Sequence, residues 1–180
     1  MMGLILLRYG EIGLKGQNRA YFTRRLRHNV RRCLKANGIE GRVWQEGQRL
    51  YLEVEDTAAA IDAVQRVAGL VSLSPVQMVP PDLEAITAEA LSLARRLDVG
   101  ERTFRVTASR ADKSFPLTSP EIERQVGAAV VNATGARVRL SGADVDIGVE
   151  VQRDRVLIFG ERMPGPGGLQ PSLALSYNSQ

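Results

Sequence analysis

Three glycines and three cationic residues lie close together near the start of the chain, in the stretch RYGEIGLKGQNR at residues 8–19. A glycine-rich turn that opens a helix can present its backbone N–H groups to a phosphate. The stretch follows the apolar run LILL, where a first strand is expected to lead into a first helix. It matches neither GxxxxGK(S/T) nor GxGxxG, the two common nucleotide-binding patterns. By itself it supports a phosphate-contacting turn and an ordinary tight turn almost equally.

Positive charge is concentrated in this part of the chain. Nine Lys or Arg residues and a single acid, Glu11, lie between Arg8 and Lys35. This segment therefore carries a formal charge of +8. Because the whole chain carries +4, its remaining residues together carry −4. Such an asymmetry favours an anionic partner, and nucleic acid is the first candidate.

A helical period begins at Asn18 and ends at the Asn37-Gly38 stop signal. The apolar positions of this period are Phe22, Leu26, Val30, Cys33 and Leu34. Four cations fall nearly opposite them at about 100° per residue: Arg24, Arg27, Arg31 and Lys35. The pattern predicts an amphipathic helix with a cationic outer face, and contact with nucleic-acid backbone is favoured over a merely solvated face.

The loop RADKSFPLTS, residues 110–119, has a similar composition. Arg110, Lys113 and Ser114 stand ahead of a helix start, which suits a phosphate or an RNA 3′ end. Phe115 could stack on a base, or pack against the protein while Thr118 or Ser119 caps the helix. We expect Phe115 to be packed and the two cations to be exposed and binding.

Residue types that usually carry catalysis or metals are sparse. His28 has no evident Ser, Cys or carboxylate partner, and Asp144 and Asp146 alternate with apolar residues on a predicted strand. The single Cys33 excludes an internal disulfide and a CxxC metal pair, so a reducing cytoplasm is expected. No apolar run approaches the roughly 20 residues that cross a bilayer. We predict no catalytic site, no bound cofactor, no metal and no membrane association in this chain.

The elements that position these residues form two groups. In the first, LILLR is a strand, the cationic helix follows, and GRVWQEGQRLYLEVE reads as a hairpin. Asp56 or Thr57 caps a second helix, and LVSLSPVQMV supplies a last strand. The order βαββαβ is the ferredoxin-like arrangement, and it predicts a domain over residues 1–79.

Pro80-Pro81 is the expected linker, because consecutive prolines continue neither helix nor sheet. Beyond it come a helix capped by Asp82, the strand TFRVTAS, and a helix opened by Ser119-Pro120-Glu121. Three strands follow, in ARVRL, DVDIGVEVQ and RVLIFGE. We predict an α+β protein of two two-layer α/β domains, the second over residues 80–165, and a tail or severed linker over 166–180.

Three strings in the chain closely resemble the amino-terminal half of the ThiI family. They are RYGEIGLKGQNRAYFTRRL, RADKSFPLTSPEIERQVGAAV and DVDIGVEVQRDRVLIFGERMPGPGGL. Members of the family are tRNA 4-thiouridine synthetases, also named as thiamine-biosynthesis sulfur carriers. The resemblance covers about residues 4 to 169. It implies an N-terminal ferredoxin-like domain to about residue 79, then a THUMP domain, an RNA-binding module, to about 165.

In the family these domains grip tRNA, and the THUMP domain holds the acceptor stem near its 3′ CCA end. A following domain with an SGGxDS motif adenylates a uridine with ATP, and a persulfide cysteine then delivers sulfur, for which a cysteine desulfurase is the sulfur donor. The present sequence has no SGGxDS and no second cysteine. The resemblance therefore implies a fragment or truncated reading frame, with ATP expected only for the missing domain and no thiolation by this chain alone.

Our first hypothesis is a tRNA-binding module that contacts mainly phosphates and RNA shape. The residues expected to neutralise backbone phosphates are Lys15, Arg19, Arg24, Arg27 and Arg31. Those expected to hold the acceptor end are Arg110, Lys113 and Ser114. Charge reversal at Arg27 and Arg31 is expected to weaken binding without unfolding, since both lie off the apolar stripe.

Two alternatives remain at this point. The cationic helix could dock an acidic protein, such as a sulfur donor, or a second copy of the chain. An autonomous nucleotide-using enzyme is the weakest alternative, because the sequence contains no phosphate-binding signature and no nucleophile in a catalytic setting.

Overall fold

The computed structural model describes residues 2–10, 17–47 and 49–167. The chain forms two compact units. Unit 1 holds the residues up to Pro75 and those from Arg162 onward, and unit 2 is Val76–Glu161. No helix in the described ranges is long and apolar enough to span a bilayer.

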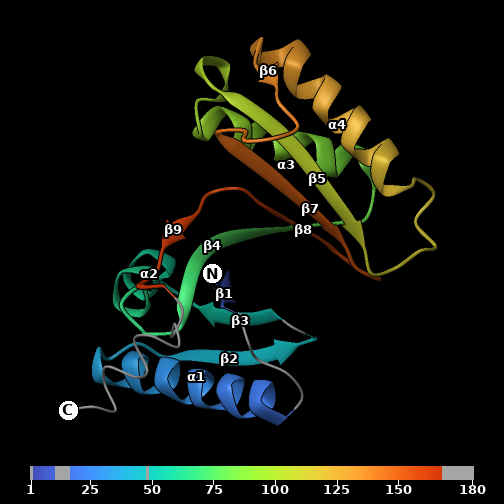
Figure 1. The fold of residues 1–180 in the computed structure, drawn as a ribbon. Coiled ribbons are helices and arrows are strands. Elements are labelled where there is room, and N and C mark those ends of the chain that lie inside the picture. Colours follow the sequence, from blue (N-terminus) through green and yellow to red (C-terminus); the bar gives the residue numbers. More distant parts are fainter. Residues whose placement is uncertain (1, 11–16, 48, 168–180) are drawn as a thin grey trace. The chain divides into compact units, whose positions relative to one another are not determined.

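Unit 1 contains the βαββαβ order that the sequence predicts (Figure 1). Its elements are β1 (Gly3–Tyr9), α1 (Gln17–Ala36), β2 (Gly41–Glu46), β3 (Arg49–Val54), α2 (Thr57–Val64) and the first part of β4 (Leu70–Val79). The strand order is β2-β3-β1-β4, and β3 pairs antiparallel with both β1 and β2. A short strand, β9 (Met163–Pro164), pairs with β4. The strand β2 therefore forms one edge of this sheet.

The helices of unit 1 pack where their apolar residues predict. Leu26, Val30 and Leu34 of α1 share a core with Ile61 and Val64 of α2 and with residues of β1 and β3. At its C-terminal end α1 stops at Gly38, whose φ of 68° is a conformation that glycine adopts at little cost. At the start of α2 the backbone N–H of Ala59 donates to the Asp56 carboxylate at 3.0 Å, so Asp56 is the cap.

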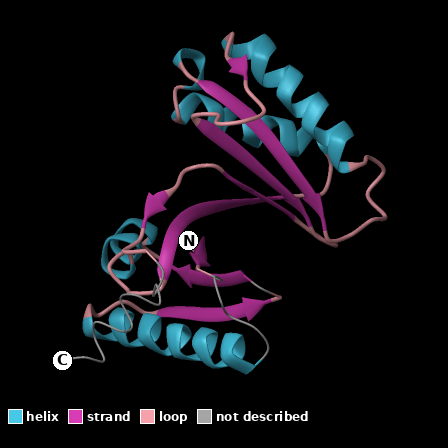
Figure 2. Ribbon diagram, in the orientation of Figure 1, coloured by secondary structure: helices cyan, strands magenta, loops and turns pink. Residues whose placement is uncertain are grey.

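Unit 2 places two helices against one mixed sheet (Figure 2). Its elements are α3 (Leu83–Arg96), a 3₁₀ turn (Val99–Glu101), β5 (Thr103–Arg110), α4 (Ser119–Thr134), β6 (Arg137–Val138), β7 (Val145–Val151) and β8 (Val156–Phe159). The strand order is β8-β7-β5-β6, with β5 parallel to β7 and β7 antiparallel to β8. Both helices contribute to one apolar core with β5, β7 and β8.

The units differ from the expected ranges at both ends of unit 2. The boundary falls at Pro75 rather than after Val79, because β4 is one continuous strand whose first part belongs to unit 1 and whose residues 77–79 pair with β8. Pro80-Pro81 lies inside unit 2, a few residues after this division. At the other end, β9 pairs with β4 at Ser72 and Leu73, which assigns residues from 162 onward to unit 1. In addition, the strand expected over ARVRL is reduced to Arg137–Val138.

Candidate nucleic-acid interface

Four cations of the well-packed helix α1 meet no described carboxylate. Arg24, Arg31 and Lys35 are exposed, and Arg27 is half-buried. Among the described residues, none of these four forms an ion pair with Asp or Glu. Their charge is therefore not neutralised within the described part of the protein, which leaves it available to an anionic partner.

The arrangement of these cations corrects the expectation that they all lie opposite the apolar stripe. Arg27 is only roughly 60° from the middle of the buried stripe at 100° per residue. Arg31 uses Nη2 to donate a hydrogen bond to the carbonyl of Val43 in β2, at 3.1 Å. The cation that points furthest from the core is Arg32, followed by Arg25 and Lys35, and all three are exposed. The helix thus has a flank beside β2 and a separate outer face.

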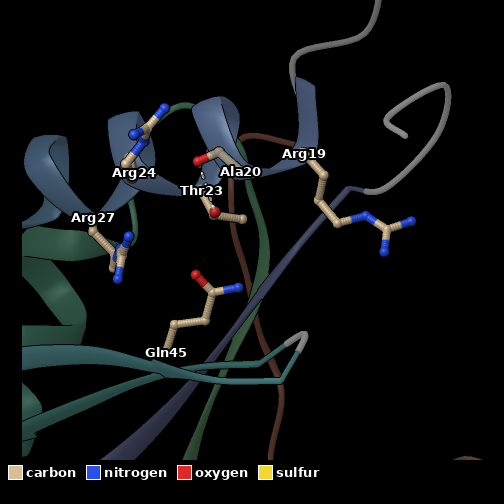
Figure 3. Close-up of a pocket in the computed structure, with 6 residues that line it drawn as sticks. All are labelled: Arg19, Ala20, Thr23, Arg24, Arg27 and Gln45. Atoms are coloured by element: carbon tan, nitrogen blue, oxygen red, sulfur yellow. Dashed lines mark hydrogen bonds between the residues drawn. The ribbon is translucent and has the colours of Figure 1, made fainter. Parts of the chain in front are cut away.

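The flank of α1 beside β2 contains a pocket of about 270 Å³ (Figure 3). Its lining residues are Arg19, Ala20, Thr23, Arg24, Arg27 and Gln45. Figure 3 shows Arg27 descending from α1 toward Gln45, which rises from β2. The Thr23 hydroxyl donates to the carbonyl of Ala20 at 3.2 Å, so this polar group is already used inside the helix. Three of the eight site residues that the sequence predicts are brought together here.

Lys15 lies outside the described residues, as does most of the glycine-rich stretch that precedes α1. The role of that stretch in contacting phosphate stays a prediction.

In unit 2, the loop between β5 and α4 is organised by its own polar groups. Arg110 uses Nη1 to donate to the carbonyls of Lys113 and Phe115, each at 3.4 Å. The Ser114 hydroxyl and backbone N–H both donate to the Asp112 carboxylate, at 2.7 and 3.0 Å. These hydrogen bonds lower the pKa of Asp112, with smaller contributions from Arg153 and Arg110. Arg110 and Ser114 therefore shape the loop, and Lys113 stands exposed on it.

The anchor of this loop agrees with the sequence prediction. Phe115 is only 8% exposed and joins the core of unit 2. Thr118 is the cap of α4, in a reciprocal arrangement with Glu121: the Glu121 N–H donates to the Thr118 hydroxyl, and the Thr118 N–H donates to the Glu121 carboxylate. The alternative in which Phe115 stacks on a base is therefore wrong, because the Phe115 ring is packed in the core of unit 2.

Sequence reasoning missed one cation beside this loop. A pocket of about 610 Å³ is lined by Ala111, Asp112, Ser114 and Arg153, and Arg153 lies in the turn between β7 and β8. The N–H of Ala111 donates to the carbonyl of Val151 at 2.8 Å, which joins the loop to the end of β7. The sequence does not show that β5 and β7 pair in parallel. Parallel neighbours end at the same edge of a sheet, so this pairing brings Arg153, which follows β7, next to the loop that follows β5.

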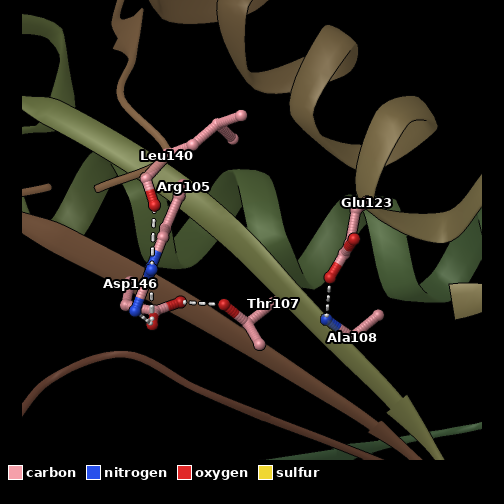
Figure 4. Close-up of polar contacts among 6 residues, drawn as sticks. All are labelled: Arg105, Thr107, Ala108, Glu123, Leu140 and Asp146. Carbon is pink, nitrogen blue, oxygen red and sulfur yellow. Dashed lines mark hydrogen bonds and ion pairs between the residues drawn. The ribbon is translucent and has the colours of Figure 1, made fainter. Parts of the chain in front are cut away.

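Asp146 of β7 (Figure 4) and Asp144, which directly precedes this strand, have structural partners. Asp146 accepts from Nε and Nη2 of Arg105, each at 2.9 Å, and from the Thr107 hydroxyl at 2.8 Å. Asp144 accepts from the N–H and hydroxyl of Thr103, and these bonds lower the pKa of Asp144. The described residues contain no group of three His, Cys, Asp or Glu that could hold a metal ion.

Comparisons with known proteins fit this geometry. A family model for the ThiI ferredoxin-like domain matches residues 4–74, and one for the THUMP domain matches residues 80–161. Probable tRNA sulfurtransferases from Thermus thermophilus and Moorella thermoacetica are each 42% identical to the chain, over 95% and 92% of its length. The chain contains a ThiI ferredoxin-like domain and a THUMP domain. It spans 42% of the length of each of these two relatives.

Two solved structures share the fold of this chain. PH1313 from Pyrococcus horikoshii Ot3 is 34% identical with a TM-score of 0.77, covering 92% of this chain and 56% of that one. A 4-thiouridine synthetase, solved as an RNA complex with bound ATP, is 29% identical with a TM-score of 0.74, covering 93% and 43%. The paired ferredoxin-like and THUMP units are therefore confirmed as the fold.

Proposed function

We propose that this chain binds tRNA as the RNA-gripping part of a 4-thiouridine synthetase. In this proposal the cations of α1 contact backbone phosphates, and Lys113 contacts the acceptor end from a loop that Arg110 and Ser114 hold in shape. The observation that carries the proposal is a set of four α1 cations that no described carboxylate neutralises: Arg24, Arg27, Arg31 and Lys35. The likeness to a 4-thiouridine synthetase solved with RNA supports it.

The chemistry of the surface suits RNA backbone. A-form RNA has a deep, narrow major groove that side chains cannot read, so a structured tRNA stem is recognised mainly through shape, phosphates and 2′-hydroxyls. Arginine matches this task because its planar guanidinium donates two parallel hydrogen bonds to a phosphate. Binding through such contacts releases counterions and therefore weakens steeply with salt.

A salt titration tests this proposal. Fluorescence anisotropy would follow binding of the full chain to tRNA and to an unrelated RNA duplex, between about 50 and 200 mM salt. With four or more phosphates neutralised, the affinity for tRNA is expected to fall by roughly a hundredfold over this range, since the slope is about 0.7–0.9 per phosphate. A flat salt response, or equal affinity for both RNAs at every salt concentration, would contradict a tRNA-binding role.

We further propose that ATP and a sulfur donor such as a cysteine desulfurase act with parts of the enzyme that this chain does not contain. The chain spans 42% of the length of its relatives, and this difference leaves room for a further domain in the longer proteins. Incubating the chain with tRNA, ATP and a sulfur source is expected to yield no 4-thiouridine, as measured by mass spectrometry of the nucleosides. Thiolation above background would overturn this division.

A further inference from the structure

We infer that the pocket between α1 and β2 is a specific seat for a single phosphate group of the RNA backbone, with Arg27 as its principal donor. This inference rests on the proposed function. It goes beyond general attraction by a cationic helix, because it assigns one phosphate to one position and predicts that neighbouring arginines of equal charge differ in importance.

The lining of the pocket has the composition of an oxyanion site. Arg19, Arg24 and Arg27 line it together with Gln45, and none of the described lining residues is acidic. The pocket beside the second loop differs, because Asp112 lines it next to Arg153. An anion in the α1–β2 pocket therefore meets two cations, Arg24 and Arg27, that have no carboxylate partner within the described part of the chain.

Arg27 carries a buried donor that lacks a partner. Its Nε atom is sealed from solvent and forms no hydrogen bond within the described part of the chain. A buried donor left unsatisfied costs about 1–3 kcal/mol, and more when the group is charged. A phosphate in the pocket would accept from the two terminal nitrogens of this guanidinium, and the planar fork of arginine is shaped for such a pair of bonds.

The surroundings limit how Arg27 can move. The side chain stands between α1 and Gln45 (Figure 3). The Gln45 amide is itself fixed, because it donates to the carbonyl of Gly47 at 2.8 Å. A half-buried arginine flanked by a helix and a strand loses less side-chain freedom on binding than a fully exposed one, which favours binding at this position.

The first test compares two substitutions on the same helix. Arg27→Gln and Arg32→Gln each remove one charge, but Arg32 is exposed and does not line the pocket. The seat predicts that Arg27→Gln lowers tRNA affinity by about tenfold or more, the scale of a lost charged hydrogen bond. Arg32→Gln is expected to cost no more than about threefold, as for a screened surface charge. Arg27→Lys is expected to restore little, because a lysine cannot form the paired bonds.

The second test fills the pocket without removing a cation. Ala20→Glu places a carboxylate at the lining, and Tyr21→Glu places the same charge one residue later, at a position that is 57% exposed and outside the lining. Ala20→Glu is expected to weaken tRNA binding about tenfold and Tyr21→Glu by less than threefold. This pair keeps the inference testable if Arg27→Gln lowers the stability, which thermal unfolding would reveal.

A third measurement uses inorganic phosphate alone. Titration of the isotopically labelled chain is expected to shift the amide resonances of Thr23 and Gln45 in wild type and not in Ala20→Glu. If Arg27→Gln and Arg32→Gln weaken tRNA binding equally and phosphate shifts neither amide, the seat is wrong although tRNA binding itself survives. If the affinity of the wild-type chain for tRNA does not depend on salt, the proposed function itself is contradicted, whatever the variants show.

Discussion

The α1 flank of unit 1 and the loop after β5 in unit 2 present cations in opposite ways. On α1 a packed apolar stripe fixes the backbone, and the bonds from Arg25 to the Tyr21 hydroxyl and from Arg31 to Val43 of β2 add to it. In the loop, Arg110 donates hydrogen bonds to two neighbouring carbonyls, and Ser114 donates to the Asp112 carboxylate. A regular element leaves its polar side chains available to a ligand, whereas an irregular one uses many of them to hold its own shape.

The largest expected effect concerns the anchor of the loop. Phe115→Ala removes a ring that is 8% exposed from the core of unit 2, and we expect a loss of about 3–5 kcal/mol in the free energy of unfolding. Tyr21→Ala on α1 is the matched control: that ring is 57% exposed, and its removal should cost less than about 0.5 kcal/mol. Urea unfolding measures both. A loss below about 1 kcal/mol for Phe115→Ala would show that the loop does not depend on its anchor.

A smaller effect separates the two cationic regions in binding. Arg24→Glu and Lys113→Glu each reverse one exposed charge. We expect about a tenfold loss of tRNA affinity for Arg24→Glu, because it lies in a row without described carboxylates, and about threefold for Lys113→Glu, because Asp112 is one residue away. Anisotropy at a fixed salt concentration of about 0.1 M measures the ratio. Equal losses of tRNA affinity in the two variants would contradict the expectation that the α1 cations contribute more to binding than the loop cation.

The smallest effect is a pH response confined to the loop. Hydrogen bonds from Ser114 hold the pKa of Asp112 below its ordinary value. A carboxyl whose pKa is lower in the folded state contributes stability above its unfolded pKa, and this contribution is lost as the pH falls through the folded pKa. The amide resonance of Ser114 is therefore expected to move on acidification below about pH 4. Asp112→Asn should abolish that movement, and its persistence would assign the titration to another group.

Much of this organisation could be predicted from the sequence. The cap residues, the buried stripe of α1 and the burial of Phe115 each depend on local pattern, and local pattern is what a sequence displays most directly. The βαββαβ order of unit 1 followed from the same signals.

What the sequence could not show depends on pairing between distant residues. The role of Arg153 beside the loop requires the register of β5 with β7, and the bond from Arg31 to Val43 requires β2 to lie next to α1. The division at Pro75 depends on such pairing too, because it lies inside the single strand β4 and no loop separates the two parts of that strand.

The continuity of β4 has a practical consequence for anyone who would separate the two halves. A polypeptide that starts at residue 80 lacks Gln77, Met78 and Val79, the partners of β8, and would leave the backbone of that strand open to other chains. A polypeptide that stops at residue 79 lacks β9, which completes the hydrogen bonding of Ser72 and Leu73. Dissection at the two prolines would thus damage both halves, and soluble pieces would have to share the strand by duplicating it.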